Sequence, residues 1–127
     1  RVLSHEVDPA QPETLVRALA ELLPTGAVQR EDAAAWVAFG AAASTRPWLA
    51  DTYWEALQIM RTWVEGILTD ARKAGRMRVD LSPAEGARLV TAVVNGLTLD
   101  LLNAPPTESD EVIGQLRSGL GLILRGL

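Results

Sequence analysis

The sequence has no cysteine and only one histidine, His5, among its 127 residues. Without cysteine there can be no disulfide and no thiolate zinc site, and such a chain suits a reducing cytoplasm. A single histidine in a proline-containing N-terminal stretch supports neither a Ser-His triad nor a metal site with imidazole ligands. A glycine-rich phosphate loop after a strand is also missing. We therefore expect no metal, no cofactor and no enzymatic activity.

Long apolar runs are missing as well. No window approaches the roughly 18 uninterrupted apolar residues that a membrane-spanning helix needs, and there is no signal peptide with a charged start and an apolar middle. Hydrophobic residues make up 48% and charged residues 22% of the chain, which excludes a disordered tail and a membrane protein. The length fits one domain with a sizeable core. We expect a cytoplasmic globular domain with no membrane partner.

An excess of basic charge is lacking too, because the formal net charge is −4. An acidic domain repels phosphate backbones unless its basic residues gather on one face. The one basic cluster, at Arg72, Lys73, Arg76 and Arg78, is better explained by a helix C-terminus and the loop after it. These residues are therefore poor DNA binders on their own. The first residue is Arg1, so we expect the chain to be part of a longer protein.

What the sequence does contain is helical periodicity. Apolar residues recur at intervals of three and four between helix breakers, and no strand pattern of any length is found. The predicted helices span residues 12–23, 30–44, 47–74 and 83–103, with a fifth that begins after 107–110 and continues to 127. Ser44 or Thr45 is expected to cap the third helix, with Pro47 in its first turn. The predicted fold is all-α, a five-helix bundle over residues 13–127 with residues 1–12 as a lead-in.

The strongest local signal is the segment "DLSPAEG" at residues 80–86. Ser82 can cap the fourth helix, and Pro83 suits its first position. Glu85 completes a capping box by reaching back to the backbone of the cap. Gly75 is expected to terminate the third helix, where glycine is favoured. The boundaries around this loop are thus predicted more firmly than the others.

The stretch "TAVVNGLTLDLLN" at 91–103 is compatible with two structures. Asn95-Gly96 marks a β-hairpin when alternating runs flank it, and the following "LTLDL" does alternate. The preceding "EGARLVTAVV" does not alternate and follows a firm helix start, so we predict a helix. This helix is apolar on two sides, which is usual for a helix buried on two sides. One side carries Val90, Val94, Leu97 and Leu101, and the flatter side, where another helix has room to approach, carries Leu89, Ala92, Gly96 and Leu99.

The last predicted helix repeats its aliphatic residues in alternating steps of three and four, as a short coiled coil does. The repeat consists of Ile113, Leu116, Leu120, Ile123 and Leu127, accompanied by the small residues Gly114, Ser118 and Gly121. Two interpretations stay open, namely packing within the domain and a symmetric four-helix dimer interface with two helices from each subunit. The candidate interface residues are Leu89, Ala92, Gly96, Leu99, Ile113, Leu116, Leu120 and Ile123.

Aromatic residues are few, and all six lie between residues 36 and 63. They can form a small core, or they can line a ligand pocket, because pockets are largely apolar with a few placed polar groups. The alanine and glycine around them leave space for a pocket. The candidate ligand-binding residues are Trp36, Phe39, Trp54, Met60 and Trp63, with Thr91 and Asn95 from the fourth helix. A cation over tryptophan faces is compatible with this set, but nothing in the sequence selects it.

The segment "ILTDARKAGRMRVDLSPAEGARLVTAVVNGLTLDLL" resembles the C-terminal half of TetR-family transcriptional regulators of the BetI-type branch. The shared features are a long helix ending at Ala74-Gly75, a short basic loop to Val79-Asp80, and then Pro83, Ala87 and Gly96-Leu97. The upstream "AAAWVAFGAAASTRPWLADTYWEAL" is similar to the family's stretch with Trp36, Phe39, an alanine at 42 or 43, Pro47 and Leu49. The resemblance covers nearly the whole chain, and the order and spacing of the motifs make it fairly specific.

The resemblance implies a regulatory domain that binds a small-molecule effector and forms a homodimer through its last two helices. It also implies an N-terminal helix-turn-helix, missing before Arg1, that binds operator DNA. Asn95 departs from the pattern, since the position before Gly96 is often acidic in the family. We predict the effector-binding and dimerisation domain of a TetR-like repressor whose operator binding is relieved by a small molecule. The alternative is a stand-alone helical dimerisation protein without a ligand pocket.

Overall fold

The computed structural model describes residues 6–78, 80–105 and 109–127. The helices in these ranges are α1 (Glu13–Ala20), α2 (Ala27–Ala43), α3 (Pro47–Lys73), α4 (Pro83–Asn103) and α5 (Ser109–Gly121). The β-type pairing in the same ranges is a single isolated bridge between Met77 and Leu124. The predicted all-α, five-helix fold is confirmed. Over the described residues, none of these helices combines the length and the apolar character that crossing a membrane requires.

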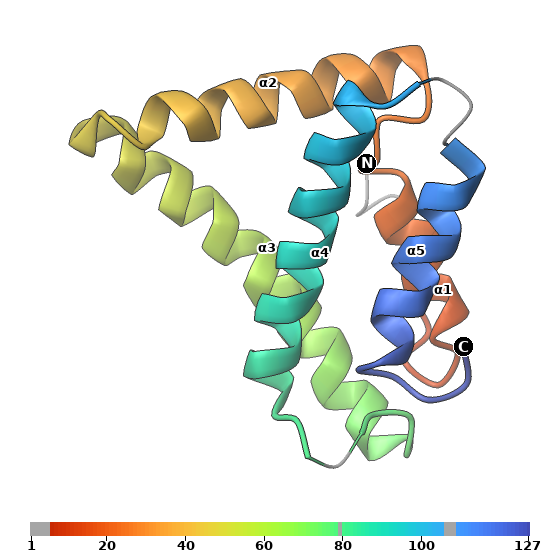
Figure 1. Ribbon diagram of the computed structural model, residues 1–127. Coiled ribbons are helices and arrows are strands. Elements are labelled where there is room, and N and C mark those ends of the chain that lie inside the picture. The colour runs from red at the N-terminus through yellow and green to blue at the C-terminus, as the bar shows by residue number, and fades with distance from the viewer. Residues whose placement is uncertain (1–5, 79, 106–108) are drawn as a thin grey trace.

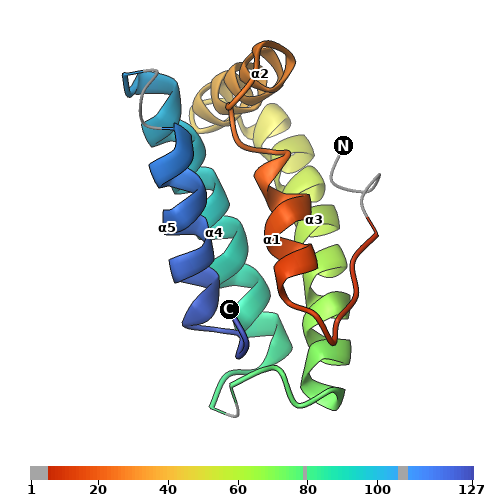
Figure 2. The same cartoon turned by 90° about the vertical axis from the view of Figure 1, so that its right-hand side faces the viewer.

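The helices form an arm and a bundle (Figure 1). α2 crosses one end of the molecule, and α3 returns from the far end of α2, so the two helices meet at a projecting tip. α1, α4 and α5 run roughly alongside the second half of α3, as the turned view shows (Figure 2). α4 packs against α2, α3 and α5. It therefore contacts both the arm and the bundle.

One apolar core holds the bundle together. The face predicted for α4 is part of it, because Val90, Val94 and Leu101 are buried. Burying one such side chain contributes roughly 1.5–3 kcal/mol relative to leaving it in water. The helices α1, α3 and α5 and the turn after α1 supply fully buried side chains, among them Leu15, Leu19, Leu23, Val64, Leu68, Leu116 and Leu120. The core thus fixes α1, α3, α4 and α5 relative to one another.

The loop between α3 and α4 has a defined structure at each end, as the sequence predicted. Ser82 Oγ accepts a hydrogen bond from the Glu85 backbone N–H at 3.1 Å, and Glu85 Oε1 accepts one from the Ser82 N–H at 3.4 Å. These two bonds confirm the capping box. At the other end Gly75 has φ of +73°, and the Arg76 N–H donates to the Ala71 carbonyl at 2.9 Å, as in a Schellman motif. Together these motifs turn the chain so that α4 packs against α3.

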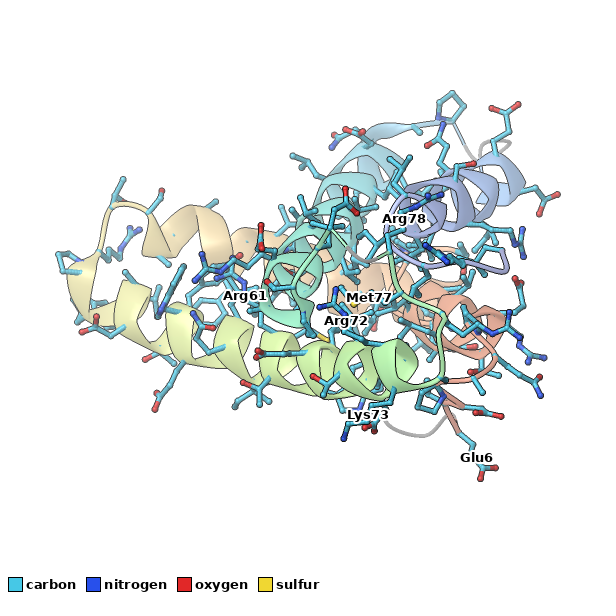
Figure 3. The ribbon with its side chains drawn as sticks, turned by 90° about the horizontal axis from the view of Figure 1, so that it is seen from below. Glu6, Arg61, Arg72, Lys73, Met77 and Arg78 are labelled. Carbon is cyan, nitrogen blue, oxygen red and sulfur yellow. The ribbon has the colours of Figure 1, made fainter. Side chains whose placement is uncertain are left out.

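The basic cluster forms part of this loop structure. Arg72 Nη2 donates to the Arg78 carbonyl at 3.1 Å, and Arg78 Nη2 donates to the Gly121 carbonyl at 3.0 Å. Figure 3 looks onto this end of the molecule, where Arg72, Met77 and Arg78 lie. Arg72 therefore holds a carbonyl of the α3–α4 loop, and Arg78 holds the last carbonyl of α5. This is the structural explanation that the sequence favoured, namely a helix C-terminus and the loop after it.

Some helix boundaries differ from the prediction. α1 ends earlier, at Ala20, and α2 begins earlier, at Ala27. Neither Ser44 nor Thr45 caps α3, whose N-cap is Arg46 without a side-chain hydrogen bond. Their hydroxyls instead donate back to carbonyls of α2, at 2.7 Å for Ser44 and 3.4 Å for Thr45. A short polar side chain between two helices can bond to the helix behind it as readily as to the one ahead.

α5 also ends earlier than predicted, at Gly121, so Ile123 and Leu127 lie beyond it. The backbone turns there toward the α3–α4 loop, and the Arg78 N–H donates to the Ile123 carbonyl at 3.0 Å. This bond gives the carbonyl a partner outside the helix. The aliphatic repeat of the sequence therefore extends beyond the last residue of α5, because contacts with the α3–α4 loop end the helix at Gly121.

Candidate functional site

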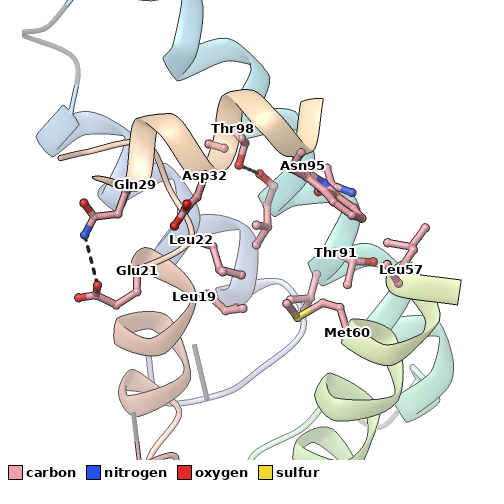
Figure 4. Close-up of a pocket in the computed structure, with 15 residues that line it drawn as sticks. Leu19, Glu21, Leu22, Gln29, Asp32, Leu57, Met60, Thr91, Asn95 and Thr98 are labelled. Atoms are coloured by element: carbon pink, nitrogen blue, oxygen red, sulfur yellow. Dashed lines mark hydrogen bonds between the residues drawn. The ribbon is translucent and has the colours of Figure 1, made fainter. Parts of the chain in front are cut away.

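A cavity of about 290 Å³ lies between α1, α2, α3 and α4 (Figure 4). Its apolar lining consists of Leu19, Leu22, Ala33, Trp36, Ala56, Leu57, Met60, Val90 and Val94. Its polar lining consists of Glu21, Gln29, Asp32, Thr91, Asn95 and Thr98. Small-molecule sites are concave and mostly apolar, with a few polar groups that fix orientation. The cavity has this form, and its volume lies near the lower end of the roughly 300–1,000 Å³ that such sites span.

The predicted residues Trp36, Met60, Thr91 and Asn95 all line the cavity. Trp36 Nε1 donates a hydrogen bond to Asn95 Oδ1 at 3.1 Å, which joins α2 to α4 across the cavity. An indole N–H can only donate, so the amide oxygen of Asn95 must face it. The Asn95 Nδ2 group is left as a donor, and none of the described residues accepts from it.

The two threonines of the lining are both buried, each 4% exposed. Their hydroxyls donate to carbonyls of their own helix, Thr91 to Ala87 at 3.0 Å and Thr98 to Val94 at 2.7 Å. These local bonds satisfy the hydroxyl hydrogens within a buried helix face. Thr98 was not among the predicted ligand residues, although it follows Thr91 by seven positions and so lies on the same side of the helix.

Glu21, Gln29 and Asp32 line the cavity and were missed by the sequence prediction. Gln29 Nε2 donates to Glu21 Oε2 at 3.5 Å, and Figure 4 shows these side chains with Asp32 at one end of the cavity. Asp32 precedes Trp36 by four residues, about one helical turn. This spacing could have indicated that Asp32 lies on the same side of α2 as Trp36. Glu21 lies in the turn after α1, where no periodic pattern could have indicated it.

Three predicted ligand residues lie outside the lining: Phe39, Trp54 and Trp63. Phe39 packs edge-on against Trp36, with ring centroids 5.9 Å apart, and against Tyr53 at 5.5 Å. Trp54 is 54% exposed, and the Arg61 guanidinium lies over its ring at 5.0 Å. Trp63 packs against the core. One helix cannot direct all of its aromatics to one cavity, because successive residues are separated by about 100° around the axis.

The interface residues predicted on α4 are exposed in the single chain. Leu89 is 48% and Leu99 is 49% exposed, and Ala92 and Gly96 between them are exposed as well. A Cβ added at Gly96 would meet no atom within 4 Å. We call these four residues the α4 strip. The strip is an apolar surface that nothing in the described part of the chain covers.

The interface residues predicted on α5 lie mostly elsewhere. Leu116 and Leu120 are 0% exposed and Ile123 is 2% exposed, because they belong to the core of the chain itself. Their coiled-coil-like spacing reflects packing within the domain, so the prediction that they contact a partner is corrected. Ile113 is half-buried at the edge of the core and keeps an exposed part.

A model of the family described as "BetI-type transcriptional repressor, C-terminal" matches residues 12–125 of the chain. The chain belongs to this family. The match includes every residue that lines the cavity and the whole α4 strip. This confirms the resemblance drawn from the motifs around Trp36, Pro83 and Gly96. The BetI-type domain is accordingly the regulatory, effector-binding and dimerisation domain of a TetR-like transcriptional regulator.

A solved structure agrees with this assignment. The crystal structure of a transcriptional regulator from Rhodococcus sp. Rha1 matches the BetI-type domain with a TM-score of 0.81 and 26% sequence identity. The match covers 100% of this chain and 66% of that regulator's chain. A search of curated proteins gave no match. Family and fold are both those of transcriptional regulators.

Proposed function

We propose that the BetI-type domain binds a small-molecule effector in the cavity and pairs with a second copy through the α4 strip and the exposed edge of α5. The observation that carries the proposal is the apolar cavity of about 290 Å³ between α1, α2, α3 and α4. A stand-alone dimerisation protein, the alternative, needs no such cavity. The longer protein is then a cytoplasmic repressor that binds operator DNA through a segment preceding residue 13.

α4 connects the two proposed sites. Thr91 and Asn95 line the cavity, whereas their direct neighbours Ala92 and Gly96 belong to the exposed α4 strip. A helix is stiff over this distance, so a shift or rotation that moves Asn95 also moves Gly96. An effector that contacts Asn95 therefore acts on the subunit interface through the same helix.

α1 offers a second connection, toward the N-terminus. Leu19 of α1 and Glu21 of the following turn line the cavity. Before the helix, the Asp8 N–H donates to Thr14 Oγ1 at 2.8 Å, which ties the preceding chain to α1. A ligand that moves α1 would therefore move the point at which a DNA-binding segment joins the domain.

The mechanism that follows is a population shift between two subunit arrangements. Only one arrangement would place two DNA-binding segments at the roughly 34–36 Å spacing of successive half-sites. An effector can shift the equilibrium only by the difference between its affinities for the two arrangements. Moving it from 1:99 to 99:1 requires about 5.5 kcal/mol of that difference. The effector must therefore contact groups that move, as side chains on α1 and α4 would.

The direct test adds small molecules to the full-length regulator bound to a DNA fragment carrying its promoter. A compound that releases the DNA should also quench the fluorescence of Trp36, and a W36F variant should lose that part of the quenching. A W48F variant is the matched control, because Trp48 is 72% exposed and lies outside the cavity. Promoter binding that responds to no ligand would contradict the repressor mechanism.

The coding sequence before Arg1 supplies an independent test. It should encode a basic helix-turn-helix, because a chain with a formal net charge of −4 is a poor binder of phosphate backbones. An upstream reading frame without such a motif would contradict the DNA-binding part of the proposal and favour the stand-alone alternative.

A further inference from the structure

The polar side of α4 that faces the cavity has one donor group left for a ligand. Thr91, Asn95 and Thr98 follow one another at steps of four and three residues, so they share a side of the helix. The hydroxyls of Thr91 and Thr98 donate to carbonyls of α4 at 3.0 Å and 2.7 Å. A hydroxyl has one hydrogen to donate, so neither threonine has one for a ligand. On this side of the cavity the donor is therefore the amide of Asn95.

The Asn95 amide presents its N–H₂ group, because its oxygen is already engaged. Oδ1 accepts from Trp36 Nε1 at 3.1 Å, and an indole N–H can only donate, so this bond fixes the orientation of the amide. Nδ2 carries two hydrogens, and no residue in the described part of the chain accepts either of them. A ligand that covers Asn95 excludes water from these hydrogens. It must then supply an acceptor or leave them unsatisfied, which costs affinity.

The charged residues of the lining do not call for a charged ligand. Glu21 and Asp32 both already have partners in the chain, and one partner of Glu21 is Gln29, whose Nε2 donates to it at 3.5 Å. A cation would have to displace an existing interaction before it could pair with either acid. An anion would be repelled by both acids, and among the described residues no lysine, arginine or histidine lines the cavity. The lining therefore favours a neutral molecule.

We infer that the effector is a small neutral molecule with an apolar body and a carbonyl oxygen that accepts a hydrogen bond from Asn95 Nδ2. The apolar body packs against the aliphatic part of the lining, which includes Leu57 and Met60 of α3. Figure 4 shows Asn95 near this part of the cavity and apart from Glu21 and Gln29. The inference rests on the proposed function, since it assigns a ligand class to the same cavity.

Nuclear magnetic resonance of the ¹⁵N-labelled 127-residue chain observes the inferred hydrogen bond directly. The probes are 2-hexanone and 2-methyl-1-hexene, which have the same shape but carry C=O and C=CH₂ respectively. We expect 2-hexanone to move the side-chain amide proton signal of Asn95 downfield, because a new acceptor deshields the proton, and the alkene to cause no such shift. Asn103 is the other asparagine of the chain, lies exposed on α4 and does not line the cavity, so its amide signal is an internal control.

Titration followed by the same signals tests the charge of the ligand. Hexylamine and hexanoate, of similar length, carry a positive and a negative charge at neutral pH. We expect each to bind about tenfold or more weakly than 2-hexanone, because a charge moved from water into an apolar site without a free partner is costly.

A variant of Asn95 measures the contribution of the donor. Leucine has a similar branched shape without polar atoms, so N95L should lower the ratio of 2-hexanone affinity to 2-methyl-1-hexene affinity by about tenfold, or about 1.4 kcal/mol. Comparing the two probes cancels changes that affect both equally. N103L is the matched control and should leave the ratio unchanged. Circular dichroism shows whether each variant is folded, and the shift of the Asn95 signal in the unmodified chain does not depend on any variant.

Each outcome decides the inference. An Asn95 amide signal that 2-hexanone leaves in place, or that the alkene moves downfield equally, overturns it. Tighter binding of hexylamine or hexanoate than of 2-hexanone also overturns it, as does an unchanged affinity ratio in folded N95L or no binding of 2-hexanone at all. The proposed function is tested separately, by ligand-induced release of promoter DNA from the full-length regulator, and it survives if a ligand of another class releases the DNA.

Discussion

At the scale of single residues, the pairing of Trp36 with Asn95 has the widest consequences. The indole N–H has one hydrogen to donate, and the Asn95 oxygen accepts it from another helix at 3.1 Å. This bond fixes a wall of the cavity and leaves the amide N–H₂ of Asn95 for a ligand. It also gives Asn95 a structural role, because the bond joins α2 to α4.

A double-mutant cycle measures this hydrogen bond. N95A leaves the part-buried indole N–H without its partner and should lower the free energy of unfolding by about 1 kcal/mol or more. W36F/N95A removes both groups, so its loss should be smaller than the sum of the single losses by about 0.5–1.5 kcal/mol. Urea denaturation of the four proteins gives these values. Strict additivity would show that the bond contributes nothing to stability.

The pair Glu13–Arg117 predicts a small pH dependence. The hydrogen bond from Arg117 lowers the pKa of Glu13 below its ordinary value of 4.5. Because the pKa of Glu13 is lower in the folded than in the unfolded chain, its contribution to stability is present above the unfolded value and is lost as the pH falls through the folded value. The side chains are 43% and 44% exposed, so solvent screening keeps the contribution small.

We expect E13Q to lower the melting temperature by at most a few degrees at pH 7, and by nothing at a pH below the folded pKa of Glu13, where the carboxyl is protonated in both states. Thermal unfolding followed by circular dichroism at both pH values gives the comparison with the unmodified chain. E55Q, which removes an exposed acid of α3, is the control and should show no such difference between the two pH values. An E13Q effect that persists at low pH would exclude the ion pair as its source.

At the scale of helices, Gly86 determines how closely α4 approaches its neighbours. A Cβ at this position would lie 2.8 Å from Leu68 Cδ1, 3.2 Å from Met77 Cε and 3.3 Å from Ile123 Cγ2. These atoms come from α3, from the α3–α4 loop and from the C-terminal segment. The first turn of α4, set by the capping box of Ser82, therefore packs where three segments meet.

G86A should lower the free energy of unfolding by about 1 kcal/mol or more, because overpacking costs more than the roughly 1 kcal/mol of helix propensity that alanine adds. G66A is the control, since a Cβ at Gly66 would meet nothing within 4 Å. It should raise the free energy of unfolding by about 0.5–1 kcal/mol. Chemical denaturation distinguishes the two, and equal stabilisation by both would contradict the close packing at Gly86.

At the scale of the whole molecule, three faces of α4 would each have a separate role in the proposed dimer. Its buried face contains Val90 and Leu101, its cavity face contains Asn95, and its exposed strip contains Leu89 and Leu99. A second copy that covers the strip would remove apolar surface from water at about 25 cal/mol per Å². The cavity and the subunit interface would then share one helix.

We expect the unmodified chain to sediment as a dimer at micromolar concentration, and L89E and L99E to shift it to monomer, because a charge buried at an interface is costly. I59E is the control, since Ile59 is 71% exposed on α3, away from the strip. Circular dichroism should show all three variants folded. A monomeric unmodified chain, or dissociation by I59E alone, would refute the proposed interface.

The candidate site was only partly predictable from the sequence. Trp36, Met60, Thr91 and Asn95 were found because aromatic, adaptable and polar side chains stand out on otherwise plain helices. Phe39, Trp54 and Trp63 were included for the same reason but lie outside the lining. A helix's rotation about its axis is set by its packing partners, so aromatic content cannot say which aromatics face a cavity.

The sequence by itself determined the all-α fold, the α3–α4 loop and the start and end of α4, because caps and helical periodicity depend on residues within about four positions of each other. It left open whether the aliphatic repeat of α5 faces the core or a partner. Only the tertiary structure decided that Leu116 and Leu120 are buried, and that Glu21 and Asp32 lie at one end of a cavity reaching to Asn95. The reason is that these positions are brought together by helix packing, which depends on contacts between residues far apart in the chain.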